Sequence, residues 1–168
     1  MGIDPGVANT GFGVVRLAGG QMTAVDGGVI ELGSDLAPAT RLARIHGELE
    51  KLIAWHEPAA VALEDVFFNK NVRSAIAVGE ARGVAMLAAA RRGIPCFDYT
   101  PQAVKMAVCG TGAAAKPQVQ QMVGTLLGLA RQPESDHTAD ALAVAICHAG
   151  HSRMRTAVAS GAPAAVGA

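Results

Sequence analysis

The feature that limits the fold most is a change of pattern along the chain. Two apolar segments, Thr10–Leu17 and Met22–Leu32, flank the glycine pair Gly19-Gly20, which predicts a β-hairpin. Beyond the hairpin, short apolar segments alternate with longer segments of helical periodicity, which predicts alternating strands and helices. A hairpin followed by strand–helix alternation predicts an α/β fold in which helices cover a mixed sheet.

Residue spacing and residues that end helices define the other elements. Apolar residues from Leu42 to Ile53 recur at intervals of three and four, which predicts a helix that Pro58 ends. A long helix that ends at Gly93 is predicted over residues 71–92, because glycine commonly follows a helix. Further helices are predicted at 101–108, 116–129 and 136–147, and further strands at 1–3, 60–63 and 94–99. Residues 1–151 are expected to form one domain, and the small-residue segment 152–168 a disordered tail.

Composition excludes several classes of protein. With 51% hydrophobic residues, the chain can bury enough apolar surface to fold, which excludes a disordered protein. No apolar run approaches the ~20 residues that a membrane-spanning helix needs, and no secretion signal begins the sequence. The three cysteines, Cys96, Cys109 and Cys147, have no spacing typical of a metal or redox site. We therefore expect buried, reduced thiols in a cytoplasmic protein.

Charge is distributed unevenly, although the formal net charge is zero. Residues 1–65 contain nine acidic and four basic residues, whereas residues 66–131 contain eight basic and two acidic ones. Such asymmetry can produce a basic face that suits a polyanion in a molecule that is neutral overall. The simpler alternative is that these charges only solvate helices, and charge taken alone favours that alternative.

Three carboxylates stand at the ends of apolar elements. Asp4 follows the first short strand, Glu64 ends the strand at 60–63, and Asp140 lies on the last helix. Neighbouring parallel strands end at the same edge of a sheet, so Asp4 and Glu64 meet if their strands are neighbours. Two carboxylates ~4 Å apart repel by about 4 kcal/mol at an effective dielectric constant of 20. Such a cluster is tolerated if it binds cations such as Mg²⁺ or Mn²⁺, or stays partly protonated. Taken singly, each acid could equally be a helix cap or a solvated terminus.

Several segments, in order from Gly2 to His148, resemble the RuvC family of bacterial Holliday junction resolvases. They read GIDPG…TGFGVV, ALEDVFFNKNVRSAIAVGEARGVAMLAA, TPQAVKMAVCGTGAAAKPQVQQMV and HTADALAVAICHA. The resemblance implies an RNase H-like α/β fold with a mixed five-stranded sheet and helices on both faces. It also implies a homodimer that nicks four-way DNA junctions symmetrically in recombination and repair, leaving 5′-phosphate and 3′-hydroxyl ends. Partners implied are the branch-migration proteins RuvA and RuvB, and the implied cleavage preference is a short thymine-rich sequence.

By the same resemblance, four residues form the catalytic and metal-binding set, with two Mg²⁺ or Mn²⁺ ions per site: Asp4, Glu64, His137 and Asp140. His137 stands where many members have aspartate. Because imidazole is a better ligand for Mn²⁺ than for Mg²⁺, we hypothesise that Mn²⁺ supports activity at least as well as Mg²⁺. His137 could instead act as a base that orients the attacking water. The neighbouring Asp136 is turned away from His137 by ~100°, the helical angle of one residue.

The resemblance also implies residues that contact DNA. Lys105 and Lys116 match lysines near the scissile phosphate, and Phe67 matches an aromatic residue that contacts junction bases. Lys70 and Arg73 lie in the adjoining basic segment and are predicted to bind DNA as well. In the helix 71–92, the glycines Gly79 and Gly83 indicate close backbone approach, either to the chain's own sheet or to a symmetry mate.

One departure concerns the start of the chain. Only three residues precede Asp4, fewer than the family usually has, so either the first strand is short or the natural start lies upstream.

Other functions stay open at this point. One alternative is an RNase H-like nuclease with another substrate, such as an RNA–DNA hybrid. A second alternative is a protein that binds junctions without cleaving them, although such a protein would have no reason to keep mutually repelling carboxylates. A third, an actin- or hexokinase-like ATPase, would need a second domain half, for which 168 residues leave no room.

Overall fold

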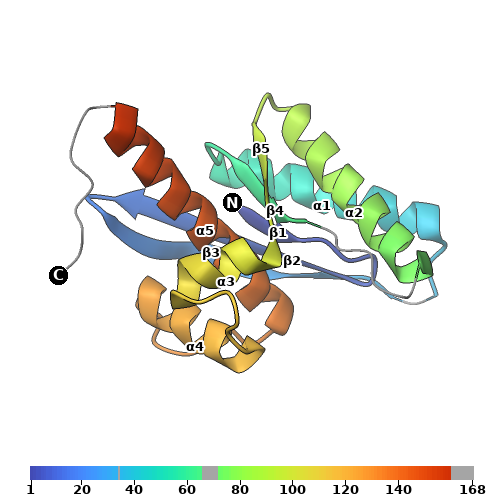
Figure 1. The fold of residues 1–168 in the computed structure, drawn as a ribbon. Helices are drawn as coiled ribbons and strands as arrows, with labels where there is room; N and C mark the ends of the chain where they lie inside the picture. Colours follow the sequence, from blue (N-terminus) through green and yellow to red (C-terminus); the bar gives the residue numbers. More distant parts are fainter. Residues whose placement is uncertain (34, 66–71, 160–168) are drawn as a thin grey trace.

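The computed structural model describes residues 1–33, 35–65 and 72–159, with side chains up to residue 152. Within those ranges, five strands form one sheet: β1 (Gly2–Asp4), β2 (Asn9–Ala18), β3 (Gln21–Glu31), β4 (Val61–Glu64) and β5 (Cys96–Tyr99). The strand order is β3-β2-β1-β4-β5 (Figure 1). Pairing is antiparallel from β3 to β1 and parallel from β1 to β5, which confirms the predicted mixed sheet.

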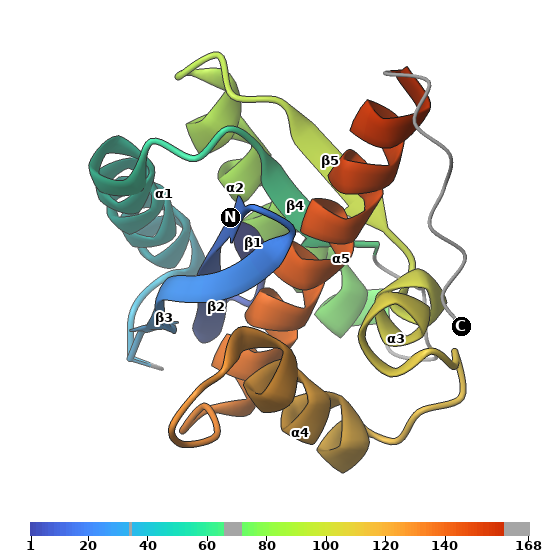
Figure 2. The ribbon, with the colours of Figure 1, turned by 90° about the vertical axis from the view of Figure 1, so that its left-hand side faces the viewer.

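Helices cover both faces of this sheet, as predicted. One face carries α1 (Pro38–His56) and α2 (Val72–Ala90). The opposite face carries α3 (Pro101–Cys109), α4 (Lys116–Leu127) and α5 (Asp136–Ala159), and Figure 2 shows the two groups on either side of the strands. Each layer has its own apolar core, so the sheet separates two cores. None of the described helices combines the length and apolar character needed to cross a membrane.

Local sequence explains where these elements turn and end. Gly19 and Gly20 have φ angles of 58° and 83°, the left-handed backbone that a two-residue hairpin turn requires and that glycine adopts without strain. Thr100 caps α3, because its Oγ1 accepts a hydrogen bond from the Ala103 backbone N–H at 3.1 Å. The hairpin turn confirms a prediction from the sequence, and α3 begins at Pro101, where the sequence predicts a helix to begin.

Alternation along β1 and β4 decides which side chains face which helices. Ile3, Val61 and Leu63 are buried in the core beneath α1 and α2. Ala62 belongs to the opposite core, which contains α5. Since successive side chains of a strand point to opposite faces, Asp4 and Glu64 face α5. The two outermost strand residues are thereby directed toward the helix that bears Asp140.

Two glycines allow α5 to lie directly on the strands. A Cβ atom on Gly2 would overlap the carbonyl oxygen of Ala141, and one on Gly11 would overlap the carbonyl oxygen of His137. Any larger residue at either position would force α5 away from the sheet. The close approach brings the first turns of α5 to the end of β1.

One expectation from the sequence is wrong, and one of two alternatives is excluded. The last helix does not end at Cys147 but continues to Ala159, so residues 152–159 are helical rather than part of a disordered tail; residues 160–168 lie outside the described range. Alanine and arginine in this stretch favour helix even without an apolar stripe. In α2, a Cβ atom on Gly79 or Gly83 would meet nothing within 4 Å. These glycines therefore do not bring α2 close to its own sheet.

Candidate active site

Asp4 and Glu64 end two neighbouring parallel strands. In the register of β1 and β4, Gly2 lies opposite Ala62 and Ile3 opposite Leu63. The next residue on each strand is Asp4 and Glu64, and both face α5. This confirms that the two carboxylates meet at one edge of the sheet, the point where open α/β sheets bind ligands.

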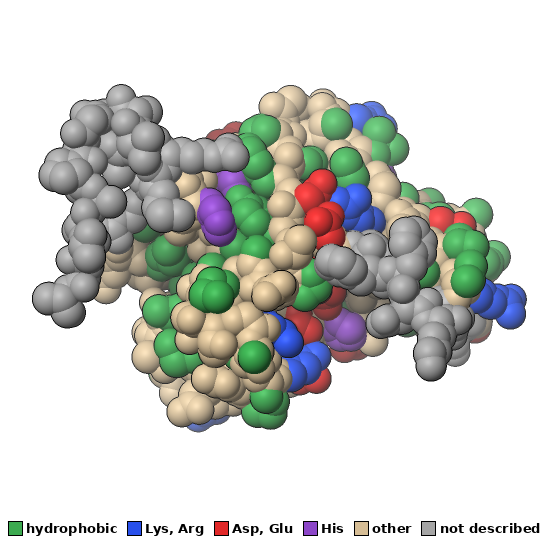
Figure 3. Space-filling view, viewed as in Figure 1, with side chains coloured by type: hydrophobic (Ala, Val, Ile, Leu, Met, Phe, Trp, Pro, Cys, Tyr) green, Lys and Arg blue, Asp and Glu red, His purple; other side chains and the backbone are tan. Residues whose placement is uncertain are grey.

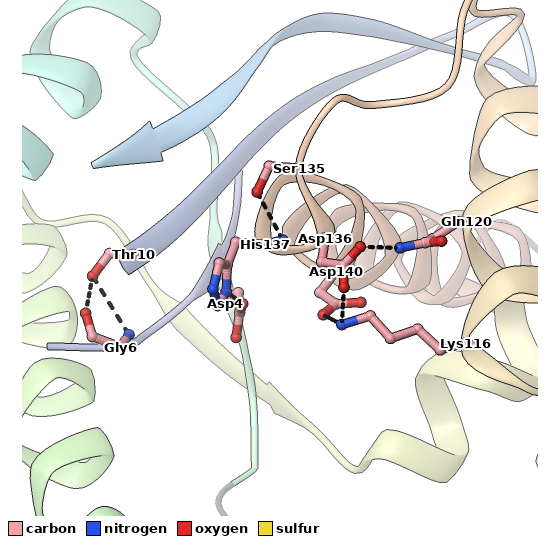
Figure 4. Close-up of polar contacts among 9 residues, drawn as sticks. All are labelled: Asp4, Gly6, Thr10, Lys116, Gln120, Ser135, Asp136, His137 and Asp140. Atoms are coloured by element: carbon pink, nitrogen blue, oxygen red, sulfur yellow. Dashed lines mark hydrogen bonds and ion pairs between the residues drawn. The ribbon is translucent and has the colours of Figure 1, made fainter. Parts of the chain in front are cut away.

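The first turn of α5 brings the side chain of His137 into contact with Asp4. The Nδ1 atom of His137 lies 2.7 Å from Oδ2 of Asp4 (Figure 4). Because a carboxylate oxygen accepts, we assign the proton to Nδ1, which leaves Nε2 of a neutral ring with a free lone pair. The helix start is fixed locally, since the His137 backbone N–H donates to Oγ of Ser135 at 3.2 Å.

Glu64 lies among like charges in a partly buried position. Burial, followed by the negative charges of Asp4 and Asp140, raises its pKa from the ordinary 4.5 to about 7, against the opposing effect of Lys105 and Lys116. Burial also raises the pKa of Asp140, although Lys116 opposes the change. The negative charges of Asp4 and Asp140 add to the effect of burial, and a bound cation would relieve their repulsion.

Lys116 lies between two carboxylates of α5 (Figure 4). Its Nζ is 3.0 Å from Oδ2 of Asp140 and 3.2 Å from Oδ2 of Asp136. Burial would lower the pKa of Lys116, but hydrogen bonding to Asp140 and then to Asp136 outweighs this effect and raises it. Asp136 contacts α4 while His137 contacts Asp4, which confirms that adjacent residues of α5 point to different neighbours.

A pocket of about 240 Å³ connects these groups with α3. Its polar lining comes from Glu64, Asp140, Lys105 and Lys116. The rest of its lining is apolar: Pro101, Val104, Val119 and Ala143. On the surface, acidic, basic and histidine side chains gather beside the α3–α4 part of the molecule (Figure 3). Cationic side chains thus adjoin the carboxylates, an arrangement that suits a phosphate whose oxygens face metal ions.

The donor set fits divalent cations in kind. Carboxylate oxygens with an imidazole are ligands for Mg²⁺ and Mn²⁺, and the charges of Asp4 and Asp140 add to the burial that raises the pKa of Glu64. As the side chains stand, no group of three acidic, histidine or cysteine residues in the described part of the chain is placed to hold one ion. Asp140 contacts Lys116 in this arrangement, and Asp4 contacts His137.

Some of the residues predicted to bind DNA do not contact this site or lie outside the described part of the chain. Arg73 is exposed in the first turn of α2, and no contact with the site is recorded for it among the described residues. Phe67 and Lys70 lie outside the described residues.

Two contributors were not predicted. Ser135 precedes a helix that begins at Asp136, and serine at that position is a recognised cap signal. Gln120 lies one helical turn after Lys116 and donates to Asp136 at 2.6 Å; no pattern in the sequence singles it out.

Comparison with known proteins identifies the family. The family model described as "Crossover junction endodeoxyribonuclease RuvC" matches residues 1–148. The chain belongs to the RuvC family. A RuvC of Pelotomaculum thermopropionicum is 53% identical over 151 residues, covering 90% of this chain and 92% of the relative. One from Rubrobacter xylanophilus is 49% identical over 166 residues, covering 99% of this chain and 93% of the relative.

Solved structures agree with this assignment. "T. thermophilus RuvC in complex with Holliday junction substrate" matches with a TM-score of 0.87 and 39% identity, covering 92% of this chain and 94% of that one. The match confirms the RNase H-like α/β fold that the resemblance implied. Membership of the RuvC family makes the chain an endodeoxyribonuclease and excludes the ATPase alternative.

Proposed function

We propose that this chain resolves Holliday junctions by symmetric hydrolysis of phosphodiesters, leaving 5′-phosphate and 3′-hydroxyl nicks, in recombination and DNA repair. Membership of the RuvC family and the likeness to a RuvC solved with a Holliday junction support the substrate. The observation that carries the proposal is the convergence of Asp4, Glu64 and Asp140, from β1, β4 and α5, beside Lys116.

Asp4, Glu64, His137 and Asp140 are the proposed metal-binding and catalytic residues. Two Mg²⁺ or Mn²⁺ ions about 4 Å apart would stabilise the attacking and leaving oxygens at phosphorus. The carboxylates hold the ions, and the coupling of Glu64 to both Asp4 and Asp140 supports one shared site. Asp4 also orients the His137 ring through the 2.7 Å hydrogen bond, which leaves Nε2 for a metal ion or for the attacking water.

Lysines would position the scissile phosphate. Lys105 and Lys116 line the pocket with Glu64 and Asp140, so their ammonium groups can neutralise phosphate oxygens at that point. Arg73, Lys70 and Phe67 are proposed to bind the junction DNA, with Phe67 contacting junction bases. Stacking of one base on an exposed phenylalanine contributes about 1–3 kcal/mol.

The imidazole in the site leads to a metal preference. We expect Mn²⁺ to support cleavage at least as well as Mg²⁺, because nitrogen is a poor ligand for Mg²⁺. A His137→Asp variant should raise the rate with Mg²⁺ relative to Mn²⁺. If Mg²⁺ supports cleavage by the parent protein and Mn²⁺ does not, this expectation is contradicted.

A homodimer is proposed through α2. Exposed apolar residues recur along one side of this helix, with Val72 65%, Ile76 56% and Leu87 52% exposed. Gly79 and Gly83 lie on the same side of α2, because they follow Val72 and Ile76 at intervals of three and four. A Cβ atom at either glycine would meet nothing within 4 Å, so another backbone can approach closely. A twofold axis there would give two identical active sites, as paired nicks in a symmetric junction require.

The dimer can be tested by its mass in solution. Ile76→Asp should give a monomer in light scattering after size-exclusion chromatography and should abolish paired nicking. Trp55→Asp is the matched control, because Trp55 is 83% exposed on α1, away from the α2 stripe, and the dimer should persist. A monomeric parent protein would contradict the proposal.

The remaining partners and the compartment follow from the proposed reaction. A resolvase of this kind would act with the branch-migration proteins RuvA and RuvB on chromosomal DNA in the cytoplasm. All three cysteines are free thiols in the structure, which is compatible with a reducing compartment.

The function is tested with synthetic junctions. The parent protein should cut a four-way junction in two opposite strands when Mg²⁺ or Mn²⁺ is supplied, and Asp4→Asn should bind the junction without cutting it. Cleavage of an RNA–DNA hybrid in preference to the junction would favour another RNase H-like activity. Junction binding without cleavage by the parent would favour a binding-only protein.

A further inference from the structure

Lys116 contacts two carboxylates that differ in their surroundings. Asp140 faces Glu64, and its side chain is 33% exposed, whereas the side chain of Asp136 is 66% exposed. The Lys116 ammonium touches Oδ2 of each, at 3.0 Å and 3.2 Å. Only Asp140 belongs to the proposed metal-binding set. Lys116 therefore forms one ion pair with a proposed metal ligand, Asp140, and one with a carboxylate outside the proposed metal site, Asp136.

Asp136 is itself fixed on the side of α4. Its Oδ1 accepts a hydrogen bond from Nε2 of Gln120 at 2.6 Å, while its Oδ2 faces Lys116. Lys116 and Gln120 are one turn apart on α4, so both reach the same carboxylate (Figure 4). Asp136 thus contacts Lys116 and Gln120 of α4 and lies outside the group formed by Asp4, Glu64 and His137.

We propose that Asp136 is a positioning residue that keeps Lys116 at the active site when Asp140 turns to a divalent cation. The inference rests on the proposed function and assigns a role to a residue that the family resemblance did not include. An ammonium group and a metal ion compete for Asp140, since both are bound through the same carboxylate. Because Asp136 shares the ammonium group of Lys116, the pair between Lys116 and Asp140 is weaker than it would be alone. Without Asp136, a cation would have to displace a stronger pair from Asp140.

The proposal makes a prediction for metal binding in the absence of DNA. Titration of the DNA-free protein with Mn²⁺ in a calorimeter should show that Asp136→Asn binds the ion about threefold to fivefold more weakly, the range expected for one exposed ion pair. Glu134→Gln is the matched control, because Glu134 is an exposed carboxylate two residues away for which no ion pair with Lys116 is recorded among the described residues. Its affinity should equal that of the parent.

A double variant that lacks Lys116 shows whether Asp136 acts through Lys116 or binds the metal ion directly. With Lys116→Met present, Asp136→Asn should change Mn²⁺ affinity no more than Glu134→Gln does, because the competing ammonium is gone. An equal loss of affinity in both backgrounds would mean that Asp136 binds the ion itself, which overturns the proposal. Unchanged affinity of Asp136→Asn in the Lys116-containing protein also overturns it.

Cleavage supplies an independent check. On junctions, Asp136→Asn should require more Mn²⁺ for half-maximal rate and should lower kcat by about threefold to fivefold with unchanged junction binding. If the parent protein cleaves no junction, the proposed function fails while the Mn²⁺ titrations still decide the role of Asp136. If the parent cleaves and Asp136→Asn matches it in both measurements, only the role of Asp136 fails.

Discussion

The two faces of the sheet use alternate residues of the same strands for different purposes. Toward α1 and α2, Ile3, Val61 and Leu63 pack against large aliphatic side chains in a continuous apolar core. Toward α5, the strands offer glycine and alanine, followed at the strand ends by Asp4 and Glu64. The first face supplies buried area. The second also has an apolar core, and in addition it lets a helix approach closely enough to bring His137 and Asp140 to those carboxylates.

Because of this difference, single substitutions should be able to change the free energy of unfolding and the cleavage rate separately. Changes on the α1–α2 face should alter the free energy of unfolding and leave catalysis intact. Changes to the carboxylates at the strand ends on the α5 face should alter catalysis and have little effect on the free energy of unfolding near neutral pH. The predictions below test that separation in order of decreasing effect.

Removing a carboxylate of the α5 face should have the largest effect. Glu64→Gln should reduce the cleavage rate by more than about 1000-fold, a loss typical of essential catalytic groups. Single-turnover cleavage of a labelled junction measures it. Glu48→Gln, which removes an exposed carboxylate from α1, should cleave like the parent. Equal losses in the two variants would contradict the separation of the faces.

Truncating a core residue of the opposite face should affect stability alone. Leu49 is fully buried on α1, and Leu49→Ala should lower the free energy of unfolding by about 2–5 kcal/mol through lost burial and a new cavity. Urea denaturation measures the change. At a temperature where the variant stays folded, its kcat on junctions should match the parent; a kcat reduced tenfold would show that the faces are coupled.

Glycines on the two faces should respond oppositely to the same substitution. Gly11→Ala places a methyl group against the carbonyl oxygen of His137, so α5 must move and cleavage should fall by about 100-fold, as expected for a displacement near 1 Å. Gly47→Ala on α1 meets nothing within 4 Å and should stabilise the helix by about 1 kcal/mol. Parallel rate and denaturation measurements on the two variants decide the point. Unchanged cleavage by Gly11→Ala would show that the close approach is not required.

The smallest predicted effect is a dependence of stability on pH in metal-free protein. Because the pKa of Glu64 is about 7 when folded and near 4.5 when unfolded, the folded state binds the extra proton between these values. The free energy of unfolding of the parent should therefore fall as pH rises from 4.5 to 7, relative to that of Glu64→Gln. After allowance for partial exposure, the difference amounts to about 1 kcal/mol. Urea midpoints at several pH values measure it. A parent protein whose stability rises with pH relative to that of Glu64→Gln would contradict it.

Much of the fold and part of the site could be predicted from local patterns. The hairpin, the helix ends and the meeting of Asp4 with Glu64 depend on turn residues and strand alternation, which are short-range properties. The clamp formed by Asp136, Lys116 and Gln120 could not be predicted, because it depends on which turns of α4 and α5 face each other. Gly79 and Gly83 indicated a close neighbour, but composition does not say whether that neighbour is the same chain. The sequence predicts that the last helix ends at Cys147, and it shows no apolar periodicity after His151, yet alanine-rich sequence continues α5 to Ala159.

The central claim is that β1, β4 and α5 together hold divalent cations at the point where DNA is cut. Anomalous diffraction from crystals soaked in Mn²⁺ tests it directly. The account predicts anomalous density between Asp4, Glu64 and Asp140, with Lys116 displaced from Asp140. Density elsewhere, or none at this edge of the sheet at Mn²⁺ concentrations that support cleavage in solution, would contradict it.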